Sequence, residues 1–332
     1  MGEVLTLGEI MLRFSTEQSK RIIQSQTFHA HYGGGEANVA ISLANFGHCV
    51  RFASKVPDHA LGTAVQQHLQ QYNVATNHLL FGGARLGSYY VESGVGPRAT
   101  SVIYDRAGSS FATMTELEWD VDDLFNGVEL FHISGITPAL SDFWQAQTIY
   151  LVQAAKERGC KVSFDINYRG KLWTQQKAGE VIRQILPFVD YCSAGHLDAI
   201  YLLGVAEQSN ESLPYYYQKL QELYPNIQLF YSTKREVISA SENYLTGTLW
   251  MNQAYYESTQ QIIAPIIDRV GGGDAFAAGL LHGVLVNNEP QAMIDFATAA
   301  AVLKHTVEGD CNQFNEAEVA SFLAAGSGKI IR

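Results

Sequence analysis

The sequence predicts an α/β fold in which helices cover both faces of a mostly parallel β-sheet. Short β-rich runs alternate with longer segments of helical periodicity along most of the chain, as in consecutive β–α–β units. The length of 332 residues suits one large domain, without internal repeats. A hydrophobic fraction of 47 % and a charged fraction of 17 % supply a sizeable core and argue against disorder.

The first part of the chain contains two strands and two helices. EVLTLG (3–8) is an apolar run ending at a glycine, which predicts a buried strand. EANVAISLANF (36–46) has small and apolar residues at helical spacing and precedes Gly47, a typical helix end. CVRFASKV (49–56) predicts the next strand, and LGTAVQQHLQQY (61–72) predicts an amphipathic helix.

The second part continues the alternation. FWQAQTIYLVQAAKERG (143–159) predicts a helix, and EVISASENYLTGTLW (236–250) predicts a late hairpin. The other predicted strands are VELFHISG (128–135), KVSFDIN (161–167), DYCSA (190–194) and QLFYST (228–233).

Two segments interrupt the pattern. Residues 11–33 and about 84–112 lack helical periodicity and are rich in β-forming residues, as in GSYYVESG. We expect their strands to lie outside the main sheet as a small flap, inserted into a single domain that spans residues 1–332.

Composition excludes several classes of function. A net charge of -11 and a pI near 5.3 disfavour binding to nucleic acid or to anionic membranes. The four cysteines form no CxxC pair, which argues against a zinc site and a disulfide framework and fits a reducing compartment. The N-terminus does not have the pattern of a signal peptide, and no apolar run is long enough to span a bilayer. We therefore expect a cytoplasmic protein.

The stretch DRVGGGDAFAAGLLHG (268–283) carries the strongest chemical signal. Gly271, Gly272 and Gly273 precede a small-residue helix, so their backbone N–H groups can approach an anion where the helix dipole favours negative charge. Asp274 follows at once and could accept the proton of an attacking hydroxyl. The alternative is a flexible turn followed by an aspartate that caps the helix.

Other nucleotide-binding signatures are weak. GSGK (326–329) resembles part of a P-loop but lacks the earlier glycine, the Ser or Thr after Lys329, and a following helix. No G-x-G-x-x-G follows the first strand, so a dinucleotide fold is not supported.

The sequence resembles the ribokinase-like (PfkB) family of carbohydrate kinases, and within it the kinases of 2-keto-3-deoxygluconate. The two family elements read GGGEAN (33–38) and DRVGGGD (268–274). Further similar strings, in family order, are LGEIMLRFS (7–15), VIYDRAGS (102–109), FDINYRGKLW (164–173) and LKHTVEGD (303–310). The resemblance implies a three-layer α/β/α fold with a small β-sheet lid. It also implies transfer of the γ-phosphate of ATP, with Mg²⁺, to a sugar acid, giving 2-keto-3-deoxy-6-phosphogluconate.

The resemblance also implies roles for individual residues. Asp274 matches the catalytic base, and Gly271, Gly272 and Gly273 match the anion hole. The matches to sugar-binding positions are Gly34, Asn38, Tyr89, Tyr104, Arg106, Arg169 and Asp310. The matches to nucleotide-binding positions are Asn167, Thr233, Arg235, Gly271 and Gly273.

Two arginines support a sugar acid independently. Guanidinium groups bind carboxylates through paired, charge-assisted hydrogen bonds, and Arg106 and Arg169 both follow β-like runs. The alternative is that either arginine is a surface charge, or that Arg169 forms an ion pair with Asp165. The other predicted contacts also have structural alternatives: Tyr89 and Tyr104 as packing aromatics, Asn38 as a helix-start residue and Asp310 as part of a turn.

The chain departs from the family in two places. GHLD (195–198) stands where the family has N-x-x-E, so Gly195 replaces the asparagine and Asp198 the glutamate. We expect Asp198 to act on magnesium indirectly, through a water molecule, and His196 to be a bystander. Lys234 stands where the family more often has an apolar residue; it either approaches the nucleotide phosphates or is solvated.

Two alternatives to a sugar-acid kinase stay open. One is a kinase of the same family for a neutral sugar such as fructose, ribose or tagatose, against which Arg106 and Arg169 argue. The other is a non-catalytic sensor of a sugar or nucleotide, which the altered GHLD element favours and the intact Asp274 disfavours. Because an exposed β lid has unpaired edge strands, we also expect a homo-oligomer.

Overall fold

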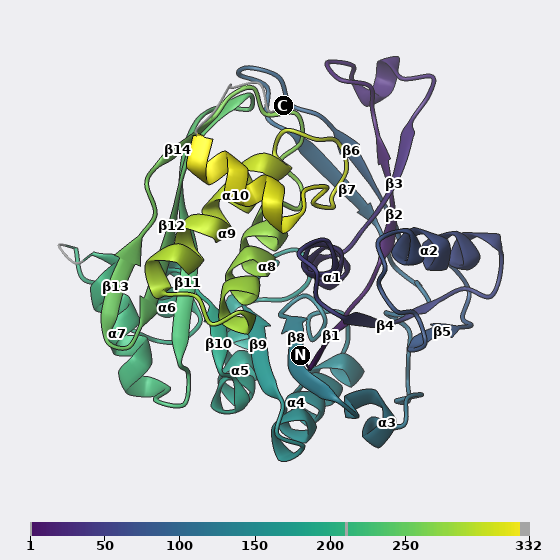
Figure 1. Cartoon of the computed structure of the whole chain (residues 1–332). Coiled ribbons are helices and arrows are strands. Elements are labelled where there is room, and N and C mark those ends of the chain that lie inside the picture. The colour runs from purple at the N-terminus through teal and green to yellow at the C-terminus, as the bar shows by residue number, and fades with distance from the viewer. Residues whose placement is uncertain (1, 210–211, 326–332) are drawn as a thin grey trace.

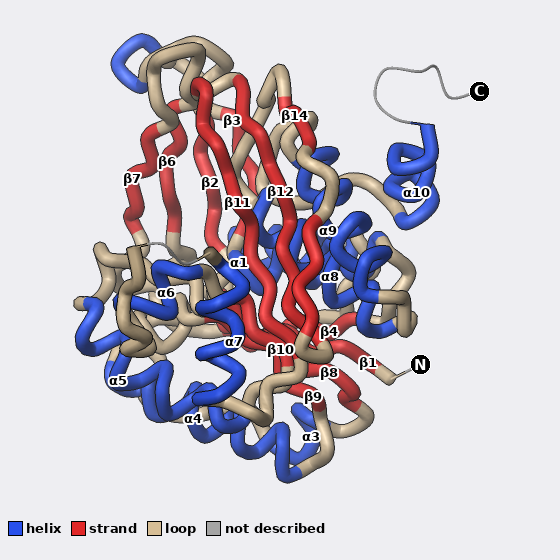
Figure 2. Tube along the Cα trace, turned by 90° about the vertical axis from the view of Figure 1, so that its left-hand side faces the viewer, coloured by secondary structure: helices blue, strands red, loops and turns tan. Residues whose placement is uncertain are grey.

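The structure is a computed structural model that describes residues 2–209 and 212–325. The predicted α/β fold is confirmed: a large mixed sheet crosses the molecule, with helices on both faces and a smaller separate sheet (Figures 1 and 2). In sheet order the strands of the large sheet are β13 (Ala254–Glu257), β12 (Glu242–Met251), β11 (Leu229–Ser239), β10 (Tyr191–Ser193), β9 (Lys161–Asp165), β8 (Val128–Ser134), β1 (Glu3–Leu7), β4 (Val50–Val56) and β5 (Leu79–Phe81), with β14 (Gln261–Ile263) beside β12. The GSGK segment lies outside the described residues.

The sheet is parallel from β5 to β11 and antiparallel from there to its other edge. A hairpin is found over 236–250, as predicted, but its first arm is the end of β11, so this arm and the strand predicted over 228–233 are one continuous strand. Together β11 and β12 continue as a long ribbon beyond the parallel strands. Parallel strands place their carboxyl ends at one edge of the sheet, so the loops that follow β1, β8, β9 and β10 lie at a common edge.

Two layers of helices cover the sheet, and each has its own buried core. On one face pack α3 (Val121–Phe125), α4 (Asp142–Glu157), α5 (Gln175–Ile185), α6 (His196–Tyr201) and α7 (Leu213–Leu223), with the 3₁₀ turn η2 (Leu186–Phe188). On the other pack α1 (Gly35–Asn45), α2 (Ala60–Gln71), α8 (Gly272–Leu285), α9 (Pro290–Lys304) and α10 (Glu316–Ala325). Among the described residues, no helix combines the length and apolar character that crossing a membrane requires.

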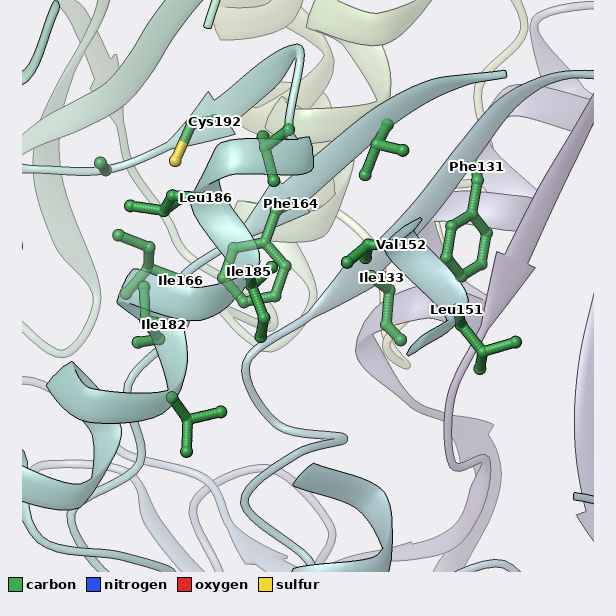
Figure 3. Packing of buried hydrophobic residues seen from close by; sticks show 14 of the residues in the cluster. Phe131, Ile133, Leu151, Val152, Phe164, Ile166, Ile182, Ile185, Leu186 and Cys192 are labelled. Carbon is green, nitrogen blue, oxygen red and sulfur yellow. The ribbon is translucent and has the colours of Figure 1, made fainter. Parts of the chain in front are cut away.

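The core beneath α4 and α5 shows how the periodicities meet. Phe131 of β8 and Phe164 of β9 point toward Leu151 of α4 and Ile182 of α5, and all four side chains are fully buried (Figure 3). Burying a side chain of this size contributes about 2 kcal/mol. The strands are apolar on both faces because helices cover both.

The smaller sheet is built from the two segments that interrupt the main pattern, as predicted. Its order is β3 (His29–Gly33), β2 (Met11–Ser15), β6 (Ser88–Glu92) and β7 (Ser101–Asp105), and the turn η1 (Ile22–Gln24) lies between β2 and β3. The strand β2 pairs in parallel with β6, and both outer pairs are antiparallel. The sheet lies beyond the carboxyl edge of the parallel strands (Figures 1 and 2), where its side chains meet the loops of the large domain.

Candidate active site

The N-termini of α1 and α8 meet at the carboxyl edge of the large sheet. Asn38, in the first turns of α1, donates a hydrogen bond from Nδ2 to Oδ2 of Asp274, in the first turn of α8, over 2.7 Å. A Cβ atom on Gly35 would lie 3.8 Å from the other carboxylate oxygen of Asp274. The two glycine-containing motifs, far apart in the sequence, therefore form one site.

The glycine run has three different environments. Gly271 has φ +80°, and a Cβ there would lie 1.8 Å from the carbonyl oxygen of Asp310. A Cβ on Gly272 would lie 2.4 Å from the ring of His305, whereas a Cβ on Gly273 would meet nothing within 4 Å. Close packing thus requires the first two glycines, against the backbone of Asp310 for Gly271 and against the His305 ring for Gly272. The third faces open space at a helix N-terminus, which favours an anion there.

Asp274 has an unusual acidity. Burial raises its pKa to about 7, the negative charge of Asp165 raises it as well, and the hydrogen bond from Asn38 together with the positive charge of Arg169 lowers it. A carboxylate with a pKa near 7 can accept a proton and release it again at neutral pH, which is the property of a general base. A simple helix cap would not need this burial.

The end of β9 brings three predicted or neighbouring groups to the site. Asn167, with φ +39°, donates from Nδ2 to Oδ2 of Asp165 over 3.1 Å. Arg169 is exposed and forms no ion pair with any carboxylate in residues 2–209 and 212–325, so the predicted alternative of a direct pair with Asp165 is not observed. Its positive charge nevertheless lowers the pKa of both Asp165 and Asp274.

The GHLD segment forms the start of α6. Oδ2 of Asp198 accepts a hydrogen bond from the backbone N–H of Gly195 over 2.8 Å, so this carboxylate caps its own helix. Burial raises the pKa of Asp198 to about 6, and the charge of Asp165 raises it further. His196 is exposed and packs near Tyr216. The helix begins normally despite the missing asparagine.

The predicted nucleotide positions on β11 lie where the strand emerges from the core. Thr233 is exposed. Lys234 binds Glu257 and lies 5.5 Å above the ring of Tyr255, so this lysine is held by β13, which lies on the far side of β12 in the sheet. Arg235 is half-buried. Burial and the nearby charge of Arg269 lower its pKa, which indicates a local excess of positive charge.

On the side of the small sheet, Arg106 is held by a carboxylate that the sequence analysis did not consider. Its Nε and Nη2 both donate to Oε2 of Glu9, at 2.8 Å for Nε, and Ser109 donates to Oε1 of the same residue. The guanidinium lies 5.8 Å above the ring of Tyr104, which is 46 % exposed and stacks on Tyr89. The face presented here is therefore aromatic with a fixed cation.

Tyr89 and Asp310 bind each other below this face. The hydroxyl of Tyr89 donates to Oδ2 of Asp310, and both residues are only 3 % exposed. The other oxygen of Asp310 accepts a hydrogen bond from Arg13 over 2.6 Å. These two predicted sugar-binding residues thus form a buried pair at the edge of the site, next to Gly271.

Sequence reasoning missed Arg13 and Glu9. Arg13 shares one face of β2 with the buried Met11 and Ser15, and an arginine on the inner face of a strand is a signal for an internal ion pair. Glu9 lies two residues after the end of β1, and a charged residue just beyond the carboxyl end of a buried parallel strand is a signal for a site.

Comparisons with known proteins identify the family of this chain. The model of the pfkB family of carbohydrate kinases matches residues 1–317. A 2-dehydro-3-deoxygalactonokinase of Haloferax volcanii is 31 % identical, with 100 % of this chain and 99 % of the relative covered.

Two solved structures have the same fold over nearly their whole length. A PfkB family carbohydrate kinase from Listeria grayi has a TM-score of 0.94 at 45 % identity, covering 97 % of this chain and 99 % of its own. A 2-dehydro-3-deoxygluconokinase from Thermotoga maritima has a TM-score of 0.94 at 36 % identity, covering 98 % and 100 %. With its predicted α/β/α layers, small sheet and glycine motifs all in place, the chain belongs to the pfkB family of carbohydrate kinases.

Proposed function

We propose that this protein transfers the γ-phosphoryl group of ATP to the terminal hydroxyl of 2-keto-3-deoxygluconate, giving 2-keto-3-deoxy-6-phosphogluconate. The observation that carries the proposal is Asp274, a half-buried carboxylate whose pKa is raised to about 7, beside an open glycine loop at a helix N-terminus. The names of similar proteins support the substrate class, because 2-dehydro and 2-keto describe the same carbonyl group.

Asp274 acts on the sugar. Its ionised form takes the proton from the terminal hydroxyl as that oxygen attacks the γ-phosphorus; the new O–P bond forms as the bond from the phosphorus to the departing ADP oxygen breaks. Asn38 holds one carboxylate oxygen through its 2.7 Å hydrogen bond and leaves the other oxygen toward Gly35, at the entrance of α1. The base is therefore oriented before the sugar arrives.

The glycine loop acts on the phosphoryl group. Backbone N–H groups at the start of α8 face the open space at Gly273 and stabilise charge on the transferred oxygens. Thr233 and Arg235 would hold the nucleotide, together with Asn167 at the end of β9. The half-buried Arg235, beside the charge of Arg269, fits a polyanion.

The residues also fit Mg²⁺ carried by the nucleotide. The charge of Asp165 raises the pKa of Asp198, so these two carboxylates share one region. In the described part of the chain, no group of three or more His, Cys, Asp or Glu side chains could hold a metal ion by itself. Magnesium is commonly bound by one or two carboxylates, phosphates and water, and it would neutralise charge on the phosphoryl oxygens. Asp198 would reach it through water.

The sugar acid would lie between the large domain and the small sheet. Arg106 and Arg169 would bind its carboxylate, and Gly34, Asn38 and Asp310 would bind or position its hydroxyls. Glu9 occupies Nε and Nη2 of Arg106, which leaves Nη1 for the substrate. Arg169 has no competing carboxylate pair among the described residues. A neutral sugar offers neither guanidinium a carboxylate.

The galactonate epimer is the second candidate substrate. It is favoured by the Haloferax volcanii relative, whose name specifies that epimer, at 31 % identity over the whole chain. The epimers differ in the orientation of one hydroxyl, so the same carboxylate receptor and base serve both.

The test is ATP turnover with 2-keto-3-deoxygluconate, its galactonate epimer, gluconate, fructose and ribose. We expect a keto-deoxy sugar acid to have the highest kcat/KM. Asp274→Asn should lower kcat by on the order of 10³-fold. The matched control is Asp142→Asn, which changes an exposed first-turn acid of α4 away from the site. Normal turnover by Asp274→Asn would exclude the proposed base.

A second pair of variants tests the substrate class. Arg106→Lys should raise KM for the sugar acid by about 10- to 100-fold, because a lysine does not reproduce the planar, charge-assisted contact. Arg85→Lys is the control, since Arg85 also belongs to the small-sheet region but pairs with Asp105 at the surface. If fructose or ribose is preferred, the substrate assignment is wrong. Binding of a sugar acid without turnover would indicate a sensor.

A further inference from the structure

Arg13 is a fully buried cation at the junction of the small sheet and the large domain. It lies on β2, and its side chain is 1 % exposed. Nη1 donates to Asp310 over 2.6 Å, Nη2 donates to Asp268 over 2.5 Å, and Nε donates to Ser15 over 2.7 Å. One guanidinium thus binds two carboxylates from two loops that are distant in sequence.

Asp268, one of these two carboxylates, holds the backbone at the start of the glycine loop. Oδ1 of Asp268 accepts the backbone N–H of Val270 over 3.0 Å, and Oδ2 accepts the backbone N–H of Gly309 over 3.1 Å. Val270 immediately precedes Gly271. The orientation of Asp268 therefore fixes the backbone that leads into the anion-binding loop.

Asp310, the other carboxylate, contacts both the small sheet, through Tyr89, and the glycine loop, at Gly271. Asp310 accepts a hydrogen bond from Tyr89 of the small sheet, whose ring stacks on the exposed Tyr104. Its backbone carbonyl packs so tightly against Gly271 that a Cβ there would lie 1.8 Å away. A shift of Asp310 would consequently move the aromatic face and the glycine loop together.

The charges in this cluster balance. Lys304 is a second fully buried cation, and its Nζ donates to the carbonyl oxygen of Asp268 over 3.2 Å. Arg13 and Lys304 thus lie among the two buried carboxylates, Asp268 and Asp310. A buried ion pair contributes little net stability, but removing one partner leaves a charge without compensation. Such an arrangement serves orientation better than it serves stability.

We propose that Arg13 is a positioning residue that holds the sugar side of the site and the glycine loop in one geometry, through Asp310 and Asp268. This inference rests on the proposed function, in which the loop binds the transferred phosphoryl group. Arg13 is buried behind these carboxylates, so it acts through them and not on the substrate. Its planar fork is needed because the two carboxylates accept from different nitrogens.

The test compares Arg13→Lys with Arg51→Lys. Arg51 is a matched control: it is 7 % exposed and pairs with Glu3 over 2.8 Å and with the carbonyl oxygen of Asn126 over 2.5 Å, where β1 begins. Both variants keep the positive charge and lose the fork. We measure melting temperature, kcat and KM with the sugar that the wild type phosphorylates fastest, and the Kd of that sugar by calorimetry without ATP.

We expect both variants to melt at lower temperatures by similar amounts. Only Arg13→Lys should lower kcat/KM, by at least 100-fold, with at least a 10-fold weaker Kd for the sugar and a lower kcat at saturating ATP. Because Arg13 acts partly through Asp268, combining Arg13→Lys with Asp268→Asn should lower kcat by far less than the product of the two single losses.

Three results would overturn the inference. One is a kcat/KM of Arg13→Lys within three-fold of Arg51→Lys; another is a full multiplication of the losses in the double variant. If Arg13→Lys does not fold, Ser15→Ala is tested in its place, because this substitution removes only the acceptor of the Arg13 Nε hydrogen bond. The third overturning result would then be an unchanged kcat/KM in Ser15→Ala. A wild type that phosphorylates no sugar contradicts the proposed function itself, whereas an active wild type with an active Arg13→Lys contradicts only this inference.

Discussion

At the scale of single residues, the chemistry of this protein depends on how Asp274 is buried. Burial raises its pKa to about 7, and Asn38 limits the rise through a hydrogen bond to the ionised form. Arg106 shows a similar balance, because Glu9 binds it before any substrate does. In both cases a neighbouring side chain orients the group through a hydrogen bond.

Replacing Asn38 should shift the pH dependence of the reaction. In Asn38→Ala the ionised form of Asp274 loses a hydrogen bond, so its pKa should rise further above 7. The base must be deprotonated, so the acid limb of kcat/KM should move to higher pH, by on the order of one unit. The measurement is kcat/KM between pH 5.5 and 9.

The control for this profile is Asn45→Ala, in the last turn of the same helix, where Nδ2 donates to the carbonyl oxygen of Asn312. Its acid limb should coincide with that of the wild type. An unmoved limb in Asn38→Ala would mean that Asp274 is not the group that titrates.

At the scale of elements, the loop before α8 combines a structural and a functional demand. Gly271 must adopt a left-handed conformation against the backbone of Asp310, while Gly273 lies under open space. The two positions can therefore be separated by mutation.

Gly271→Ala should lower the free energy of unfolding by about 3 kcal/mol, because the new methyl group meets a carbonyl oxygen in addition to an unfavourable φ. Gly273→Ala should change stability by less than about 0.5 kcal/mol and still reduce kcat, because the methyl group enters the proposed anion site. Urea unfolding and steady-state kinetics measure both quantities.

Gly127→Ala isolates the effect of the backbone conformation. Gly127 has φ +75°, and a Cβ there would meet nothing within 4 Å. Gly127→Ala should therefore lower the free energy of unfolding by only about 1 kcal/mol. Equal losses at positions 127 and 271 would contradict the clash with Asp310, and full activity in Gly273→Ala would contradict the phosphoryl site.

At the scale of the whole molecule, buried and half-buried histidines make stability sensitive to acid. Burial is the largest cause that lowers the pKa of each of five histidines to about 4: His48, His68, His132, His282 and His305. In the unfolded chain they bind protons near pH 6.5, so the fold loses stability as the pH falls from about 6.5 toward 4. Burial also raises the pKa values of four carboxyl groups, Glu36, Asp165, Asp198 and Asp274, which act in the opposite direction but are fewer than the five histidines.

We therefore expect the urea midpoint to fall between pH 7 and pH 5. The free energy of unfolding should also fall between pH 7 and pH 5. In His132→Asn this loss of free energy should be smaller by on the order of 1–2 kcal/mol, because the buried imidazole that takes up a proton on unfolding is gone. Asparagine can replace the hydrogen bond between Nδ1 and Ser163. His29→Asn, at an exposed site on β3, is the control and should show the wild-type fall. If stability falls as much in His132→Asn as in the wild type, His132 does not contribute to the acid sensitivity.

The sequence by itself determined the elements and the family of this protein. Alternating runs such as EVLTLG and EANVAISLANF predicted β1 and α1 within one residue at each end, because burial on both faces of a sheet and on one face of a helix leaves distinct periodicities. The segments 11–33 and 84–112 lacked helical periodicity and form the small sheet. Asp274 and its glycines could be recognised because only local backbone geometry is needed to place them together.

Only the tertiary structure decided which distant groups meet. Asn38 and Asp274 are 236 positions apart and share a hydrogen bond, and Arg13 reaches Asp310 across 297 positions. Glu9 occupies Arg106, which sequence reasoning treated as free for a substrate. Periodicity reports whether a side chain is buried but not which partner compensates its charge, because that partner comes from another element through the packing of the sheets. The pKa of Asp274 likewise arises from burial, a property of the folded chain as a whole.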